Sequence, residues 1–174
     1  MNKRADMAAP VSSSLLILLA MLSLQLISCG QDAEVKVIKP RLTNAGRELL
    51  SKLKGTWVVT TYSEGNCAID AQLAFPVGRA RFEIEDDALL IEPLDGVGDE
   101  ILLFPIDGVS LLAQVDFSSA SCRSSLTCEL SFTTLGERSF SGIFGQFLTS
   151  SDSITCPYEV PACQQQTNVS GIRR

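Results

Sequence analysis

Histidine is absent from the 174 residues of this chain, and lysine does not occur after Lys54. Histidine is the commonest general base, the commonest metal ligand and the side chain that titrates near neutral pH. A Ser–Lys catalytic pair is equally hard to build when the lysines lie in the first third of the chain. We therefore expect a protein that is not an enzyme, that needs no cofactor and that holds no metal ion.

Basic residues are too few to balance the acidic ones, with 14 Lys and Arg against 20 Asp and Glu and a net charge of −6. Such a balance argues against nucleic acid and against electrostatic binding to anionic lipid. The densest acidic stretch spans residues 83–100. A calcium site at residues 95–100 is the alternative to solvated turns, but the spacing matches no calcium loop, and turns favour Asp and Gly.

An apolar run long enough to span a bilayer is also lacking. Residues 15–27 form a run of thirteen, below the ~20 residues that a membrane helix needs. Lys3 and Arg4 precede this run, which is the pattern of a secretory signal. An uncleaved anchor or a plain signal with Cys29 in the mature fold are the alternatives.

The run ends in Leu26-Ile27-Ser28-Cys29, which resembles the lipobox of bacterial lipoproteins. The resemblance implies that residues 1–28 are a signal peptide and that Cys29 is lipidated on its sulfur and acylated, for instance by palmitate, on its new amine. It also implies a lipid-anchored protein of a bacterial envelope. In the family that the lipobox resembles, an Asp after the cysteine disfavours transport to the outer membrane. Here Gly30 follows the cysteine, so the resemblance favours the outer membrane over the inner one.

Two segments follow the lipobox. Residues 29–42 are polar and are expected to form a flexible tether. Residues 43–174 form one domain, which opens with a short helix because Leu49, Leu50 and Leu53 share one face and Gly55 stands where a helix ends.

From Gly55 onward the apolar period changes from helical spacing to alternation, with turn residues between the segments. No long helix joins them, which favours an all-β antiparallel barrel or sandwich. The eight expected strands are 56–62, 79–84, 88–92, 100–104, 111–117, 126–133, 139–148 and 167–173.

The sequence Gly55-Thr56-Trp57, directly after the expected helix, resembles the start of the first strand in lipocalins. The resemblance implies an eight-stranded up-and-down barrel that is open at one end and holds small apolar molecules there. It also implies that Trp57 packs across the closed end under an arginine of the last strand, Arg173 or Arg174. A lipocalin-like barrel is therefore the expected fold, with Gly55, Trp57 and Arg173 in structural roles.

The inward faces of the strands are apolar, and two interpretations stay open. They can line a ligand cavity or fill a packed core. The residues concerned are Phe82, Ile84, Val115, Phe117, Leu130, Phe132, Phe140 and Phe144. The first interpretation gives a carrier of a small hydrophobic ligand. The second gives a structural or interaction lipoprotein that binds a protein partner through its loops.

Five cysteines follow Cys29, and an exported protein meets an oxidising compartment. Because five is odd, at most two bridges form within the chain and one thiol is left over. Spacing favours Cys122–Cys128 and Cys156–Cys163 with Cys67 unpaired. A bridge from Cys67 to Cys156 or Cys163 is the alternative.

Overall fold

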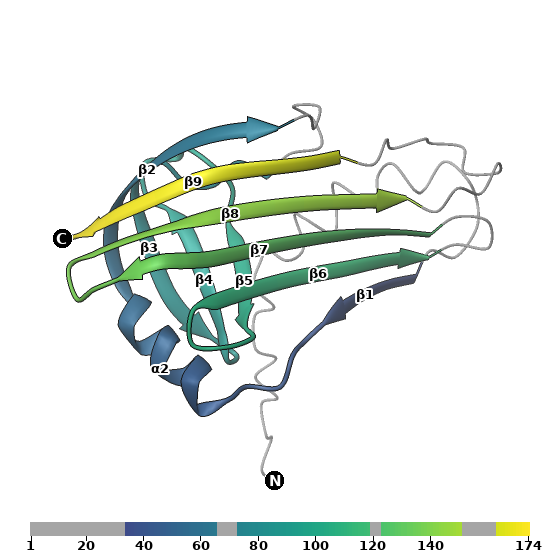
Figure 1. Ribbon diagram of the computed structural model, residues 1–174, viewed down its shortest axis with the longest axis horizontal. Coiled ribbons are helices and arrows are strands. Elements are labelled where there is room, and N and C mark those ends of the chain that lie inside the picture. Colours follow the sequence, from purple (N-terminus) through teal and green to yellow (C-terminus); the bar gives the residue numbers. More distant parts are fainter. Residues whose placement is uncertain (1–33, 66–72, 119–122, 151–162) are drawn as a thin grey trace, which may run out of the picture.

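The computed structural model describes residues 34–65, 73–118, 123–150 and 163–174, and it is almost entirely β-sheet. Figure 1 shows the elements. They are β1 (Glu34–Ile38), α2 (Asn44–Leu53), β2 (Gly55–Gly65), β3 (Gly78–Glu85), β4 (Ala88–Pro93), β5 (Ile101–Pro105), β6 (Ser110–Ser118), β7 (Arg123–Leu135), β8 (Ser139–Ser150) and β9 (Cys163–Arg173).

Eight strands close into an antiparallel barrel. Each strand from β2 to β8 pairs with the next one along the chain, and β9 returns to pair with β2. The all-β antiparallel fold predicted from the alternating pattern is therefore confirmed, and of the two alternatives, a barrel or a sandwich, the structure is a barrel. Closure leaves β2 to β9 with neighbours on both sides over much of their length, which removes most of the exposed edges that an open sheet would have.

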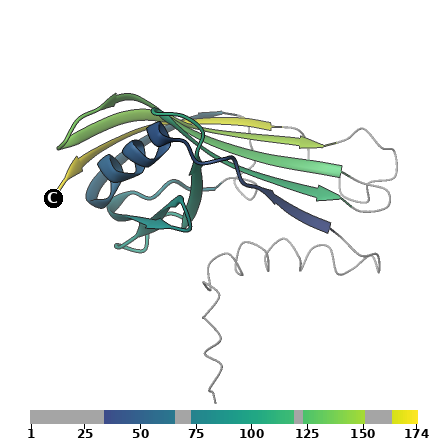
Figure 2. The same cartoon turned by 90° about the horizontal axis from the view of Figure 1, so that it is seen from below.

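The strands differ in length, and this shapes the barrel. β3, β4 and β5 have 8, 6 and 5 residues, whereas β7 and β8 have 13 and 12. Figure 2 shows α2 and the short strands gathered beneath one end of the long strands. We call this end, where α2 lies, the closed end, and the opposite end the far end.

β1 is a ninth strand that the sequence does not predict. It pairs with β6 from Glu34 opposite Ser118 to Ile38 opposite Gln114. β5 reaches along β6 only to Leu112, so the rest of this edge of β6 is available for a strand. The prediction of a flexible tether over residues 29–42 is therefore wrong for residues 34–38, which are part of the sheet.

α2 covers the closed end. Thr43 caps the helix by accepting a hydrogen bond from the Gly46 backbone N–H at 3.0 Å. Leu49, Leu50 and Leu53 are buried against the barrel. Gly55 follows at φ +141°, a conformation that favours glycine, and turns the chain directly into β2.

Candidate functional site

Trp57 lies at the closed end and is fully buried. Its indole Nε1 donates a hydrogen bond to the Leu53 carbonyl at 2.6 Å, which ties β2 to the end of α2. The Arg173 guanidinium carbon lies 4.6 Å from the Trp57 ring centroid, and Arg173 also donates to the Lys52 carbonyl. Trp57 therefore packs across the closed end beneath Arg173 of β9.

An aromatic cluster fills the interior above Trp57. The Phe140 ring is its centre, with ring centroids 5.0 Å from Trp57, 5.8 Å from Phe82 and 5.6 Å from Phe132. The exposed fractions of these four side chains are 0 to 8%. Centroid distances of this size are those of rings in direct contact, so this half of the barrel is a packed core.

Five of the eight residues predicted to line a cavity belong to the packed core. They are Phe82, Leu130, Phe132, Phe140 and Phe144. Val115 is half-buried, and the side chain of Phe117 lies outside the described residues.

Ile84 does not lie in the interior, because its side chain is 43% exposed. The reason is the register. Phe82 pairs with Gly55, the first residue of β2, so β3 extends beyond the end of β2 at Ile84, and no β2 residue lies opposite Ile84. The prediction of Ile84 as a lining residue is therefore corrected.

A segment between β2 and β3, residues 73–77, enters the core from the far-end side, and we call it the mouth segment. Phe75 is 5% exposed, and its ring centroid lies 5.1 Å from that of Phe144. The Gln146 side chain accepts a hydrogen bond from the Leu73 N–H at 2.8 Å and donates one to the Leu73 carbonyl at 2.7 Å. The protein's own chain thus occupies the interior above Phe144.

The loop between β4 and β5 fastens the mouth segment from the other side. Asp99 accepts a hydrogen bond from the Ala74 N–H at 2.6 Å, and its own N–H donates to the Ala74 carbonyl at 2.7 Å. Gly98, at φ +102°, lies so close that a Cβ there would meet Pro76 Cα at 2.6 Å. The loop and the mouth segment are therefore packed backbone against backbone.

Two of the carboxylates considered for calcium, Asp95 and Asp99, accept hydrogen bonds from the protein itself. Asp95 accepts hydrogen bonds from the backbone and side chain of Arg79 and pairs with its guanidinium at 2.8 Å. These hydrogen bonds from Arg79 lower the pKa of the Asp95 carboxyl. Within the described ranges, no group of three or more His, Cys, Asp or Glu side chains is arranged to hold a metal ion.

A polar layer lines the inner face nearer the far end. Gln165 and Thr167 on β9 are 5% and 4% exposed, and the Thr167 hydroxyl lies 2.8 Å from that of Ser63. Gln165 stands opposite Gln146 across the β8–β9 pair. Its Oε1 is buried and has no hydrogen-bond partner among the described residues. The strand alternation places these side chains inward, but β9 begins at Cys163, four residues before its predicted start.

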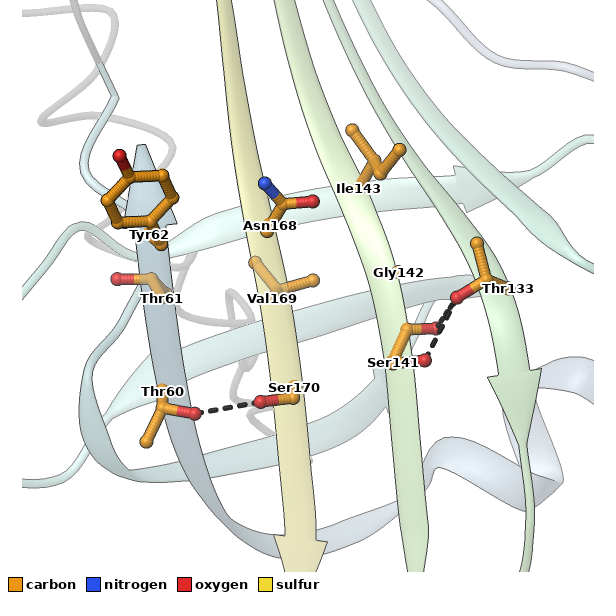
Figure 3. A pocket seen from close by; sticks show the side chains of 10 residues that line it. All are labelled: Thr60, Thr61, Tyr62, Thr133, Ser141, Gly142, Ile143, Asn168, Val169 and Ser170. Atoms are coloured by element: carbon orange, nitrogen blue, oxygen red, sulfur yellow. Dashed lines mark hydrogen bonds between the residues drawn. The ribbon is translucent and has the colours of Figure 1, made fainter. Parts of the chain in front are cut away.

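The outer face of the sheet is hollowed where β2, β9, β8 and β7 lie side by side. The hollow has a volume of about 440 Å³. Figure 3 shows its side chains, including a row formed by Tyr62, Asn168 and Ile143 on three neighbouring strands. The lining residues are Thr60, Thr61, Tyr62, Thr133, Ser141, Gly142, Ile143, Asn168, Val169 and Ser170. We call it the outer groove.

Cys128 is a free thiol inside the core, 2% exposed, which corrects the predicted bridge to Cys122. Its side chain faces inward, because Cys128 pairs with Gln146 and Ala113 on the neighbouring strands. Cys29, Cys67, Cys122 and Cys156 lie outside the described residues, and Cys163 is the first residue of β9. The bridge between Cys156 and Cys163 stays a prediction.

Burial raises the pKa of the Cys128 thiol to about 12, so the native protein should keep this thiol neutral and unreactive at pH 8. After denaturation, Cys128→Ala should have one fewer thiol that reacts with a disulfide reagent than the parent has. In the native state, the two proteins should have the same number of reactive thiols. Equal labelling of the two denatured proteins would contradict a free Cys128.

The same pKa shift predicts a pH dependence of folding. A thiol whose pKa is raised on folding stabilises the native state below its unfolded pKa of about 8.5, and this contribution is lost as the pH rises toward 12. In that window the free energy of unfolding of the parent should fall more steeply with pH than that of Cys128→Ala. If urea titrations showed the same change of unfolding free energy with pH in the parent and in Cys128→Ala, the raised pKa of Cys128 would be contradicted.

Comparison of the chain with protein-family models, with curated proteins and with solved structures gives no significant match. Among the described residues, no helix has both the length and the apolar character that crossing a membrane requires.

Proposed function

We propose that this chain is a lipid-anchored, non-catalytic lipoprotein of a bacterial envelope, with a packed barrel that binds its partner on the outside. The outer membrane is the proposed location. The observation that carries the proposal is the filled interior: Trp57, Phe82, Phe140 and Phe144 are 0 to 2% exposed, and the mouth segment places Phe75 on top of them. A barrel interior occupied by its own side chains leaves recognition to the outer surface.

The anchor is supported by the sequence before the barrel. Lys3 and Arg4, the apolar run of residues 15–27 and the lipobox at Cys29 are the features of a lipoprotein signal. β1 begins at Glu34, five residues after Cys29, and five extended residues span at most about 18 Å. A lipid on Cys29 would therefore hold the far end of the barrel close to the membrane, with α2 directed away from it.

A carrier of a small apolar ligand is the second candidate function. It is favoured by the mouth segment, because this is a loop and not a strand of the barrel. Its contacts through Gln146, Asp99 and Phe75 are few enough to be exchanged for a ligand. The buried, unpartnered Oε1 of Gln165 adds a polar group that the head of such a ligand could reach.

Trp57 is the sole tryptophan of the chain, so its fluorescence reports on the interior without labelling. We expect a fatty acid brominated on its chain to leave the Trp57 emission unquenched, because the packed core has no room for it. Saturable quenching that is lost when unbrominated fatty acid is added in excess would favour the carrier instead.

Lipidation is tested separately by the denatured mass of the protein from its native envelope. It should correspond to a chain that begins at Cys29 and carries acyl groups, and Cys29→Ser should abolish both the cleavage and the acylation. An unmodified Cys29 in the parent would overturn the envelope anchor and leave the packed barrel unaffected.

A further inference from the structure

The outer groove is uncharged, although the chain is 20% charged and carries a net charge of −6. None of its ten lining residues is acidic or basic. Bringing a charged ligand here would remove ionic groups from water without an opposite charge to pair with them. The electrostatics of the outer groove therefore favour a neutral ligand.

Hydroxyl groups gather along one row of the outer groove. The Thr60 and Ser170 hydroxyls lie 2.8 Å apart across the β2–β9 pair. Ser141 on β8 lies 2.9 Å from the Thr133 hydroxyl and 2.7 Å from that of Thr134. Each hydroxyl donates one hydrogen bond and accepts up to two, so every member keeps capacity for a ligand.

A β-bulge produces the hydroxyl cluster at Ser141. Phe132 pairs with Gly142 and Thr134 pairs with Ser141, which leaves Thr133 as an extra residue on β7. An extra residue bends and twists the strand locally and redirects its side chains. Both threonine hydroxyls consequently reach Ser141, and the sheet is hollowed where a regular ladder would be flatter.

A second row places a flat ring beside an amide. Tyr62, Asn168 and Ile143 are register partners across β2, β9 and β8, and Figure 3 shows them side by side. The Tyr62 side chain is 65% exposed and that of Ile143 is 38% exposed. An exposed tyrosine ring offers an apolar face and a polar edge, and the neighbouring asparagine offers both donors and an acceptor.

We infer that the outer groove binds a neutral polysaccharide, whose sugar rings stack on Tyr62 and whose hydroxyls bond to Asn168 and to the hydroxyl row. Neighbouring strands lie about 4.8 Å apart, so the two rows offer hydrogen-bonding groups at close, regular intervals to a ligand that carries hydroxyls along its whole length. This inference rests on the proposed function, since it names the partner of a barrel that binds on its outside.

Two other macromolecules fit the outer groove less well. Protein interfaces are enriched in aromatic residues, Met and Arg and depleted in Ser, whereas this groove holds one aromatic residue, no Met and no Arg. Nucleic acid requires Lys or Arg for its phosphates, and none lines the groove. The ligand chemistry that matches Ser, Thr, Asn and one exposed Tyr is a neutral polyol.

The test is affinity electrophoresis of the full chain through gels that contain dextran, laminarin, galactomannan or pullulan, with hyaluronate as a charged control. We expect at least one neutral glycan to retard the parent. Tyr62→Ala and Asn168→Ala should each weaken binding about tenfold, which corresponds to the ~1.4 kcal/mol of one stacking or hydrogen-bonding contact.

Ile172→Ala is the matched control, because Ile172 is 66% exposed on β9 but does not line the outer groove. It should bind as the parent does, and all three variants should melt within a few degrees of it. Three outcomes would overturn the inference: no retardation by any neutral glycan, retardation only by hyaluronate, or equal binding by the parent and Tyr62→Ala.

The inference and the proposed function can fail separately. Suppose that the parent binds no glycan and that brominated fatty acid does not quench its Trp57 emission. This result would refute only the inference that the outer groove binds a polysaccharide. If the parent binds a protein and Tyr62→Ala abolishes this binding, the polysaccharide would be refuted, but the outer surface would remain the binding site. Saturable quenching of Trp57 would refute the packed barrel on which both depend.

Discussion

Phe140→Ala should lower the free energy of unfolding by about 3–5 kcal/mol. Phe140 touches Trp57, Phe82 and Phe132 in the core, and its ring also fills the space beside Gly171, where a Cβ would clash with the ring. Removal of the ring leaves a cavity at the meeting point of several elements, and a barrel closed by hydrogen bonds on both sides of β8 cannot collapse easily to fill it. Urea unfolding followed by circular dichroism measures the loss.

Ile143→Ala is the matched control for Phe140→Ala. It removes an apolar side chain from the same strand, but one that faces outward and is 38% exposed, so the change should be within about 1 kcal/mol. A loss below about 1.5 kcal/mol in Phe140→Ala, with a small molecule bound or released, would show that the ring lines a cavity instead of filling a core.

Gln146→Ala should destabilise the protein by about 2–4 kcal/mol, because it leaves the N–H and the carbonyl of Leu73 without their partners. Gln146 is 2% exposed, so water does not easily replace the lost amide. We expect the mouth segment to open and the variant to bind an apolar dye such as anilinonaphthalene sulfonate, whereas the parent does not. Unfolding in urea and dye fluorescence below the transition measure the two effects.

Gln166→Ala separates this effect from the general loss of a glutamine, because Gln166 is exposed on the outer face of β9. Its stability and dye binding should match those of the parent. If Gln146→Ala were equally stable and bound no dye, the two hydrogen bonds to Leu73 would not be what holds the mouth segment in the barrel.

The strands were predictable because each has one apolar and one polar face. The strand predicted at residues 79–84 corresponds to β3, Gly78–Glu85, and the strand predicted at residues 88–92 corresponds to β4, Ala88–Pro93. The alternation of Ala80 and Phe82 with arginines carries this information locally. β1 was missed because its pairing depends on the free edge of β6, which no pattern within residues 34–38 reveals.

The interior was predicted in kind but not in detail. Alternation placed Phe82, Phe132 and Phe140 inward, yet it does not tell whether inward rings meet or stand apart around a cavity. The mouth segment was missed because Leu73 is held by Gln146, a residue 73 positions later in the chain. Ile84 was misplaced because the end of β2 at Gly55, and not the alternation within β3, decides its exposure.

The outer groove was out of reach for a related reason. Tyr62, Asn168 and Ser141 each face outward by alternation, but they adjoin only because β9 closes the barrel against β2 and β8. The bulge at Thr133 adds a shift in register that the sequence does not reveal. Residues far apart in the chain therefore form one surface that is visible only after closure.

A mass spectrum of the protein taken from its native envelope, recorded under native and then denaturing conditions, tests the packed barrel most directly. The native mass should equal the denatured mass, including any acyl groups on Cys29, because the aromatic core and the mouth segment fill the interior between Trp57 and Phe144 in the part of the chain that the structure describes. An additional small molecule present only in the native spectrum, and still present in Tyr62→Ala, would contradict the packed barrel and establish a carrier.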